Sequence, residues 1–429
     1  MAIWAADFQT ARTKSQDDNL ISRLKVNISR IEHRIRKLAE FGETAQGGVS
    51  RLAFSDEDIQ GRNYVISLMK DAGLDVRIDE AGNVVGRSQS QNPALPPIMF
   101  GSHTDTVPNG GKFDGALGVV GAIECAQVLL ENGAQTKHPL EVVVFADEEG
   151  GTIGSKALTG LLLPEAFDVA SQSGKTIREG IKAIGGEPDR IEKAVRNKGE
   201  VKAFLELHIE QGGILHSKDI PIGIVEGIVG INRWDVAIEG FANHAGTTPM
   251  NMRQDALLAA AELIVAIRQI VTSMPGLQVG TVGRIKAEPG APNVVPGRAV
   301  MCLELRDLSS GKIQSLFDQI QKKAYAIAEK TGTKISFSLL DAPALPALMD
   351  PRTQKLILQS AQELGLSTFR MPSGAGHDAQ NMARIAPAGM IFVPSVGGIS
   401  HSPQEFTRIE DIHNGVNVLL RTILKIDQL

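Results

Sequence analysis

Hydrophobic positions in the first part of the chain recur first with helical and then with strand spacing. Between Asn19 and Phe41 they fall three or four residues apart, which predicts an amphipathic helix with a charged outer face. A second helix should follow Ser55, because an acidic first turn comes after it and Gly73 closes the segment. Residues 75–89 alternate around an Ala-Gly-Asn turn and predict two short strands.

Continuous apolar runs come next and predict a parallel sheet. Residues 98–102 and 140–146 are predominantly apolar, and residues 115–133 between them have a helical pattern, which together predict a βαβ unit. Another strand, with alternating apolar and polar residues, should begin at Val201 and have His208, Glu210 and Gln211 as its last residues. Open α/β sheets bind ligands at the carboxyl ends of their strands, so we expect a site there.

The pattern changes near Glu226 and again near Pro346. The intervening segment reads strand, helix, strand, strand, helix, strand, which predicts a two-layer α/β sandwich inserted into the first domain. A chain of 429 residues is too long for one ordinary core. We therefore predict a catalytic domain made of residues 1–227 and 347–429, with an inserted domain at residues 228–346. The last part should hold a helix and a strand at residues 388–395.

Composition narrows the functional classes. A net charge of −5 with no basic block argues against nucleic acid or a membrane surface as partner and favours a small molecule. Cys125 and Cys302 are expected to be buried apolar residues and not a disulfide, which favours a reducing compartment. No uninterrupted apolar run reaches about 18 residues, and the N-terminal stretch lacks the pattern of a signal peptide. We expect a cytoplasmic protein.

Five acidic or histidine side chains stand at the ends of the first predicted strands or in glycine-rich turns. They are His103, Asp105, Asp114, Glu148 and Glu149. Alone, a His-Thr-Asp segment is commonly a turn and a Glu-Glu-Gly segment a solvated loop. In combination they suit zinc, manganese or cobalt, and two such ions about 3.5–4 Å apart can share a carboxylate. The pattern predicts a metal-dependent hydrolase in which Glu148 carries the proton.

Other histidines lie further along the chain. His208 ends a predicted strand beside a carboxylate and two glycines, so we expect it to be a metal ligand. His377 and His401 lie in loops, where a histidine is commonly solvated. His138 and His413 have no such context and are expected to lie on the surface.

These motifs resemble the M20 family of metallopeptidases. The resemblance rests on a strand ending in HxD, a DG about ten residues later, and a strand ending in EEG; the HIEQG segment resembles the hydantoinase/carbamoylase branch. It implies an α/β fold with a mixed-sheet di-metal catalytic domain, an inserted lid and dimerisation domain, and a homodimer. It also implies two divalent ions held by His103, Asp114, Glu149, His208 and His401.

The resemblance further implies how these ligands are arranged. Asp114 bridges the two ions. The ligand sets of the ions are completed by His103 and His401 or by Glu149 and His208. Asp105 orients His103, since a carboxylate behind a ligating imidazole fixes its tautomer. The peptide bond between Asp114 and Gly115 is cis in the family.

Substrate contacts are implied in the same way. In carbamoylase-like enzymes the positions of Asn293 and Arg306 grip the substrate carboxylate, and that of His244 polarises the carbonyl oxygen from the opposite subunit. Gln211 and His377 would supply the remaining contacts. Taken singly, His244, Asn293 and Arg306 could equally be a turn histidine, a loop asparagine and a salt-bridged strand arginine.

The implied reaction is hydrolysis of the carbamoyl group of an N-carbamoyl-L-amino acid to the amino acid, carbon dioxide and ammonia. Allantoate, ureidoglycolate and N-carbamoyl-β-alanine are alternative substrates, and peptides fit less well because HIEQG departs from the peptidase pattern. A catalytically silent binding protein of the same fold is the remote alternative. The presence of Glu148 and all five ligands argues against it.

Overall fold

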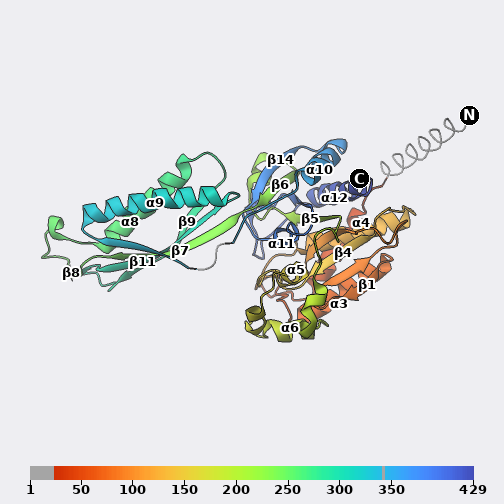
Figure 1. Cartoon of the computed structure of the whole chain (residues 1–429), viewed down its shortest axis with the longest axis horizontal. Coiled ribbons are helices and arrows are strands. Elements are labelled where there is room, and N and C mark those ends of the chain that lie inside the picture. The colour runs from red at the N-terminus through yellow and green to blue at the C-terminus, as the bar shows by residue number, and fades with distance from the viewer. Residues whose placement is uncertain (1–23, 341–343) are drawn as a thin grey trace, which may run out of the picture. The chain divides into compact units, whose positions relative to one another are not determined.

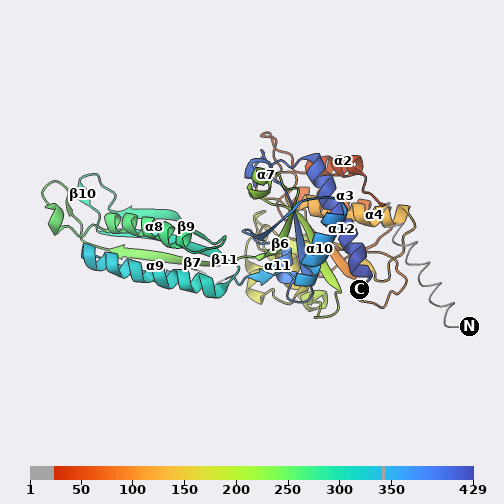
Figure 2. The ribbon, with the colours of Figure 1, turned by 90° about the horizontal axis from the view of Figure 1, so that it is seen from above.

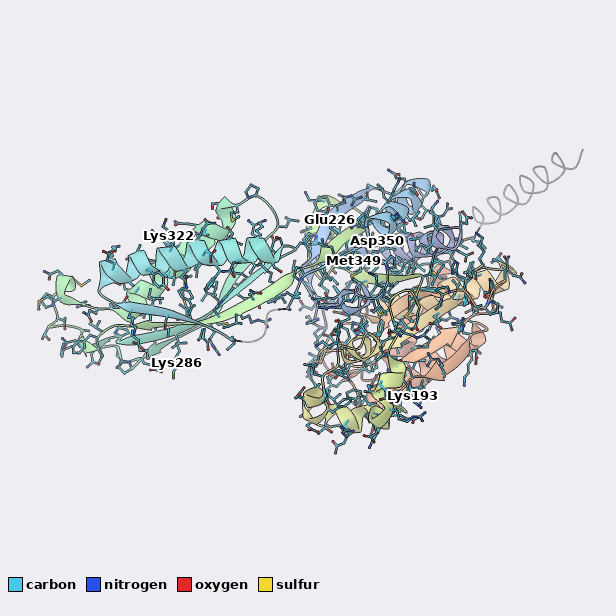
Figure 3. The ribbon with its side chains drawn as sticks, viewed as in Figure 1. Lys193, Glu226, Lys286, Lys322, Met349 and Asp350 are labelled. Atoms are coloured by element: carbon cyan, nitrogen blue, oxygen red, sulfur yellow. The ribbon has the colours of Figure 1, made fainter. Side chains whose placement is uncertain are left out.

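The computed structural model describes residues 24–340 and 344–429, and the chain divides into two compact units. Unit 1 runs to Glu226 and resumes at residues 349–371 and 377–429, whereas unit 2 comprises residues 227–348 and 372–376. Figure 3 marks Glu226 and Met349, which are joined by a backbone hydrogen bond of 3.0 Å. The N-terminal stretch interpreted above, including the start of the helix expected from Asn19, lies outside the described residues.

A nine-stranded mixed sheet forms the centre of unit 1. Its order is β1-β2-β4-β3-β5-β15-β6-β13, with β14 paired to β6 (Figure 1). The strands are β1 (Asp75–Ile78), β2 (Val84–Arg87), β3 (Ile98–His103), β4 (Leu140–Phe145), β5 (Ala203–Ile209), β6 (Ile222–Ile228), β13 (Ala347–Leu348), β14 (Thr368–Ser373) and β15 (Ala388–Val393). Of these, β13 and the last two residues of β6 and of β14 fall within the residue ranges of unit 2.

The middle four strands of this sheet are parallel. β3 pairs with β4 and β5, and β15 pairs with β5, so that the carboxyl ends of all four reach the same edge. All four are buried along their whole length. This burial fits the largely apolar sequences of β3, β4 and β15, whereas β5, predicted as an alternating strand, is buried on both faces with Glu206 and His208 included. The βαβ prediction is therefore confirmed, with α4 (Ala116–Glu131) as the connecting helix.

Helices pack around this sheet (Figure 2). Besides α4 they are α2 (Ile28–Ala39), α3 (Asp56–Asp71), α5 (Ile153–Leu158), α6 (Ile177–Ala183), α7 (Ile214–Lys218), α10 (Pro351–Glu363), α11 (Asp378–Met382) and α12 (Ile409–Asp427). Ser55 caps α3 as predicted, its side chain accepting from the N–H of Asp58. The predictions above do not include α12, which packs against α10, α4 and β15 and buries Val416 and Ile423 in the main core.

Unit 2 has the predicted two layers. Its four-stranded antiparallel sheet has the order β12-β7-β11-β9, and α8 and α9 share a core with it. The elements are β7 (Gly230–Glu239), β8 (Asn243–His244), α8 (Ala256–Ser273), β9 (Val279–Glu288), β10 (Val294–Val295), β11 (Arg298–Asp307), α9 (Ser310–Thr331) and β12 (Lys334–Leu339). The order of the long elements is the predicted one, and β8 and β10 pair as a small separate ribbon.

Among the described residues, α8 is the one helix whose length and apolar composition would allow it to cross a membrane. Its inner face, with Ala259, Leu263 and Ile267, is buried against the sheet of unit 2. Leu258 and Val265 are exposed on its outer face. The apolar composition of α8 thus serves a core on one side and leaves an apolar surface on the other.

Candidate metal centre

The shared edge of the parallel strands brings the predicted ligands of unit 1 together. His103 ends β3, Glu149 follows β4, His208 lies near the end of β5, and His401 follows β15. Asp114 comes from the loop before α4. Their ligand atoms form two groups, each with atoms within 4.8 Å of one another, and Asp114 belongs to both.

The first group is His103, Asp114 and His208. The Nε2 atoms of the two histidines lie 3.6 and 3.1 Å from Oδ1 of Asp114. Their Nδ1 atoms lie 3.0 Å from the carbonyl oxygen of Asp105 and 2.9 Å from that of Ile209. Because a carbonyl only accepts hydrogen bonds, each Nδ1 carries the hydrogen, and the Nε2 lone pairs are directed at the site.

The second group is Asp114, Glu149 and His401. Nε2 of His401 lies 3.3 Å from Oδ2 of Asp114 and 3.5 Å from Oε1 of Glu149. The ligand pairing predicted from the sequence is therefore wrong: His103 lies with His208, and His401 lies with Glu149. Sheet order accounts for the first pairing, because β5 neighbours β3. It does not account for the second, because β15 is not next to β4, and the loop after β15 brings His401 to Glu149.

Electrostatics at this cluster favour positive charge. Burial alone would lower the pKa of His103, but Glu148, Asp105 and Asp114 raise it well above its usual range. Burial opposes ionisation of Asp114 as well, yet the three histidines hold its pKa well below its usual range. Its hydrogen bond with Asp114 raises the pKa of His401 to about 9.

The residues present therefore fit a divalent cation. Imidazole nitrogens with fixed tautomers and carboxylate oxygens are the donors that zinc, manganese and cobalt accept. The positive charge that the carboxylates favour on the imidazoles is also what a cation would supply in their place. The chemistry of the donor atoms and the charges around them therefore both favour a bound divalent cation.

The turn at Asp114 differs from the expectation in one respect. The peptide bond between Asp114 and Gly115 is trans and not cis as the resemblance implied. Among the described residues, the one cis peptide bond is Glu288–Pro289. The chain turns here through Gly115, whose φ is 61°. A Cβ atom at this position would lie 2.4 Å from Nε2 of His103, so both the backbone conformation and the available space require glycine.

Asp105 lies behind His103, where it was predicted, but it contacts the ring mainly through its backbone. The carbonyl oxygen is the nearer partner of Nδ1, and Oδ1 of the side chain lies 3.6 Å away. Oδ2 accepts a hydrogen bond of 3.1 Å from the N–H of Glu149. Asp105 thus joins the loop after β3 to the loop that carries Glu148 and Glu149.

Glu148 is buried beside the first group. Its Oε2 atom lies 3.7 Å from Nε2 of His103. Burial raises the pKa of Glu148 well above its usual range, although His103 opposes the shift. A carboxyl group whose pKa is raised by burial holds a proton more readily, which suits it to accept and return one during a reaction.

Gln211 and His377, predicted as substrate contacts, both lie at this centre. The side-chain amide of Gln211 donates to Oδ2 of Asp114 at 2.7 Å and lies 3.3 Å from Nε2 of His401. His377 is buried, with its ring 4.5 Å from that of His208. Burial, reinforced by His208, lowers the pKa of His377 well below its usual range, so this ring is neutral.

The predicted substrate contacts of unit 2 fall into two places. His244 and Asn293 adjoin, since β8 pairs with β10 and the N–H of Ala245 donates to the carbonyl of Asn293. This ribbon lies at one end of the unit 2 sheet (Figure 1 and Figure 2). Arg306 lies toward the other end of β11, eight residues beyond Arg298, which is about 25 Å at ~3.3 Å per residue.

One unit 2 therefore cannot direct Asn293 and Arg306 at the same carboxylate. Nδ1 of His244 accepts from the N–H groups of Gly246 and Thr247 at 3.0 and 3.2 Å. The ring hydrogen consequently sits on Nε2, where it can be donated to a substrate oxygen.

Two further residues at the centre were not anticipated. Arg51 is buried, and its guanidinium donates to the carbonyl of Thr104 at 2.7 Å, within the turn that carries His103. Glu405 is buried and accepts from the backbone N–H of Asp114 at 3.1 Å. Nothing in the local sequence of either residue indicates these contacts, which join segments far apart in the chain.

His138, expected on the surface, is buried. Its Nδ1 lies 2.7 Å from the carbonyl of Pro96, and its backbone N–H donates to Asp427. His138 therefore joins three distant segments of unit 1.

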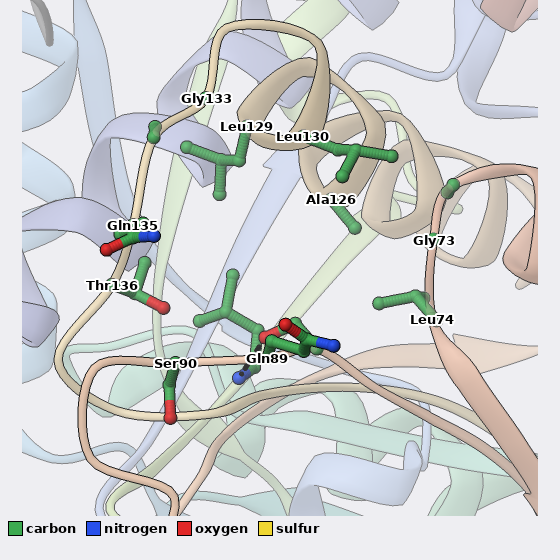
Figure 4. A pocket seen from close by; sticks show the side chains of 14 residues that line it. Gly73, Leu74, Gln89, Ser90, Ala126, Leu129, Leu130, Gly133, Gln135 and Thr136 are labelled. Atoms are coloured by element: carbon green, nitrogen blue, oxygen red, sulfur yellow. Dashed lines mark hydrogen bonds between the residues drawn. The ribbon is translucent and has the colours of Figure 1, made fainter.

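A separate cavity of about 380 Å³ lies between the turn after α3, the segment after β2 and the C-terminal end of α4 (Figure 4). Leucine, serine, glutamine and threonine side chains line it together with alanines and glycines. None of these lining residues is ionisable, so we assign it no part in the chemistry.

A buried cluster of imidazoles and carboxylates, with a further carboxyl group at its side, defines the class of metal-dependent hydrolases. Comparison with known proteins agrees. Residues 99–425 match the model of peptidase family M20/M25/M40. The chain belongs to this family.

Individual relatives span nearly the whole chain. The N-carbamoyl-L-amino acid amidohydrolase of Geobacillus stearothermophilus is 41% identical over 93% of this chain and 98% of its own. The allantoate amidohydrolase of Bacillus subtilis is 36% identical over 91% of this chain and 96% of its own. A crystal structure of a hydantoinase/carbamoylase family amidase from Burkholderia multivorans superposes with a TM-score of 0.87 at 33% identity, covering 94% and 98%. The predicted family and the mixed α/β fold are confirmed.

Proposed function

We propose that this protein hydrolyses N-carbamoyl-L-amino acids to the amino acid, carbon dioxide and ammonia, using two divalent ions of zinc, manganese or cobalt. The observation that carries the proposal is the pair of ligand groups sharing Asp114, with Glu148 buried beside them. The similarity to N-carbamoyl-L-amino acid amidohydrolases over nearly the full chain supports the substrate class. We further propose a cytoplasmic location.

His103, Asp114 and His208 would hold one ion, and Asp114, Glu149 and His401 the other. Bound there, the ions would lower the pKa of a water molecule and polarise the ureido oxygen. Glu148 takes the proton of the water that adds to the ureido carbon and returns it to the α-nitrogen as the C–N bond breaks. The carbamic acid that remains decomposes to carbon dioxide and ammonia.

His244 donates its Nε2 hydrogen to the oxygen on which negative charge develops, because its Nδ1 is already an acceptor. His377 is neutral and buried beside His208, where it contacts the substrate without adding charge. Gln211 reaches both Asp114 and His401 through its side-chain amide, which places an N–H donor beside the second ligand group for contact with the substrate.

The proposal is tested by substrate comparison. The purified protein is loaded with manganese, cobalt or zinc and supplied with a set of N-carbamoyl-L-amino acids, allantoate, ureidoglycolate, N-carbamoyl-β-alanine and dipeptides. Release of ammonia, or of free amine for the dipeptides, is measured. We expect the highest kcat/KM for an N-carbamoyl-L-amino acid, and a higher value for a dipeptide would refute the proposal.

Allantoate is the second candidate substrate. It combines a carboxylate with ureido groups and so offers the same reacting atoms, and the chain is also similar to an allantoate amidohydrolase. A higher kcat/KM for allantoate than for every N-carbamoyl-L-amino acid would favour this candidate.

We expect Arg306→Lys to lower kcat/KM for substrates that carry a carboxylate. The Nε of Arg306 donates to Glu304 at 2.7 Å and one Nη1 hydrogen to the carbonyl of Gly374 at 2.6 Å, which leaves further donors on its planar group. Lysine keeps the charge and loses the two-pronged geometry.

The measurement compares each substrate with its carboxamide analogue, for which the change should be small. Arg298→Lys is the matched control, because Arg298 is an exposed arginine on the same strand. Equal losses with the acid and its amide would make Arg306 a structural residue.

The separation of His244 and Asn293 from Arg306 supports a shared active site. We propose a two-fold dimer through unit 2, in which His244 and Asn293 of one subunit serve the site of the other. The surface suited to it is the edge strand β9, which pairs on one side only, together with the exposed face of α8. Leu257, Leu258 and Val265 supply apolar area there.

Mixing two inactive variants tests this arrangement. We expect His244→Ala and Glu148→Gln each to be inactive alone and about a quarter of the sites to recover after random subunit exchange, since one site of each mixed dimer is intact. Ammonia release is measured, and native mass spectrometry verifies the exchange. Verified exchange without recovery would mean that His244 does not act in the opposite subunit.

A further inference from the structure

Glu405 joins the two loops that carry Asp114 and His401. It lies in the loop after β15 and is only 5% exposed. Oε1 accepts hydrogen bonds from the backbone N–H groups of Phe113 at 2.9 Å and Asp114 at 3.1 Å. Oε2 accepts from the hydroxyl of Ser400 at 2.9 Å, next to His401.

The same hydroxyl lies 3.1 Å from Oδ2 of Asp114. Ser400 therefore stands between the two carboxylates, and its single hydrogen is donated to one of them at a time. Glu405 thus contacts Asp114 from two directions, directly at its backbone and through Ser400 at its side chain.

The chain leaves space for this carboxylate at Gly111. A Cβ atom on residue 111 would lie 2.0 Å from Oε1 of Glu405 and 2.1 Å from its Cδ. Gly111 has no left-handed backbone conformation to explain its lack of a side chain. The close approach of Glu405 supplies the reason.

We propose that Glu405 is a positioning residue for the metal centre: it holds the backbone of Asp114 and the loop of His401 in register so that both can ligate ions. The inference rests on the proposed function, because it needs Asp114 and His401 to be ligands. Groups behind metal ligands that fix ligand orientation typically change metal affinity or activity by about 10–100-fold when removed.

The test is a calorimetric titration in which Mn²⁺ is added to the metal-free full-length protein and the binding affinity is measured. We expect Glu405→Ala to bind Mn²⁺ about 10–100-fold more weakly than the parent. Glu405→Gln should lose less, because its amide oxygen can still accept from Phe113 and Asp114. At saturating Mn²⁺, kcat should recover in part while KM stays near the parent value, which a purely structural defect would not produce.

Gly111→Ala gives an independent approach that leaves Glu405 in the chain. Its methyl group displaces the carboxylate, so it should weaken Mn²⁺ binding as Glu405→Ala does, and it should add little in a Glu405→Ala background. Glu410→Ala is the matched control, since Glu410 is an exposed acid nearby in the chain and should leave Mn²⁺ affinity unchanged.

The outcomes separate the two proposals. A parent protein that binds none of Mn²⁺, Co²⁺ and Zn²⁺ would refute the proposed function. A parent that binds two ions while Glu405→Ala and Gly111→Ala keep its affinity would refute the positioning inference alone. If Glu405→Ala does not fold, Glu405→Gln and Gly111→Ala decide the question: parental affinity in both refutes it.

Discussion

Glu148→Gln is expected to lower kcat by roughly 10²–10⁴, the usual contribution of a positioned general acid–base group. Glutamine has nearly the same shape but cannot accept and return a proton. Glu148 belongs to neither ligand group, so the ions should stay bound. The loss should appear in kcat with little change in metal content.

The control is a measurement of the metal content of purified Glu148→Gln. The matched variant for comparison is Glu149→Gln. The two glutamates adjoin in the chain, yet only Glu149 lies in a ligand group. Glu149→Gln should lose metal, whereas Glu148→Gln should lose turnover. A Glu148→Gln protein with two ions and the parent rate would remove Glu148 from the chemistry.

Asp114→Asn is expected to abolish binding of both ions, and activity with them. Asp114 is the one residue in both ligand groups, and its carboxylate lies within 3.6 Å of the Nε2 atoms of His103, His208 and His401. An amide offers one neutral oxygen where the site needs a charged bridge.

Metal stoichiometry distinguishes this variant from its neighbours. His208→Ala and His401→Ala each remove a ligand from one of the two metal groups, so each should retain one ion. Retention of two ions by Asp114→Asn would show that Asp114 is not the bridge. Retention of two by His208→Ala would remove His208 from the ligand set.

The sequence was most informative where chemistry and local pattern coincide. His103 and His208 stand at the ends of apolar strands, and parallel strands place their carboxyl ends at one edge. The strand pattern and the residue types therefore indicated His103 and His208 as candidate ligands at this edge, whereas His401 was implied only by the family resemblance. The capping of α3 by Ser55 is local in the same sense, since its partner lies three residues away.

Contacts between distant segments could not be predicted in this way. The pairing of His401 with Glu149 depends on the path of the loop after β15, and the burial of His138 depends on Pro96 and Asp427. Glu405 has no distinguishing pattern around it, because its partners Phe113 and Asp114 lie 292 and 291 residues earlier in the chain. Residues 372–376 belong to unit 2 although their neighbours on both sides belong to unit 1.

The discontinuity of unit 1 bears on how the protein is made. Most of unit 2, residues 227–348, is complete on the ribosome while unit 1 still lacks β15, the loop of His401 and α12. Domains generally fold as units as they are synthesised, so unit 2 should fold first. The second ligand group forms only after residue 401 has emerged, so binding of the second proposed ion would be a late step in maturation.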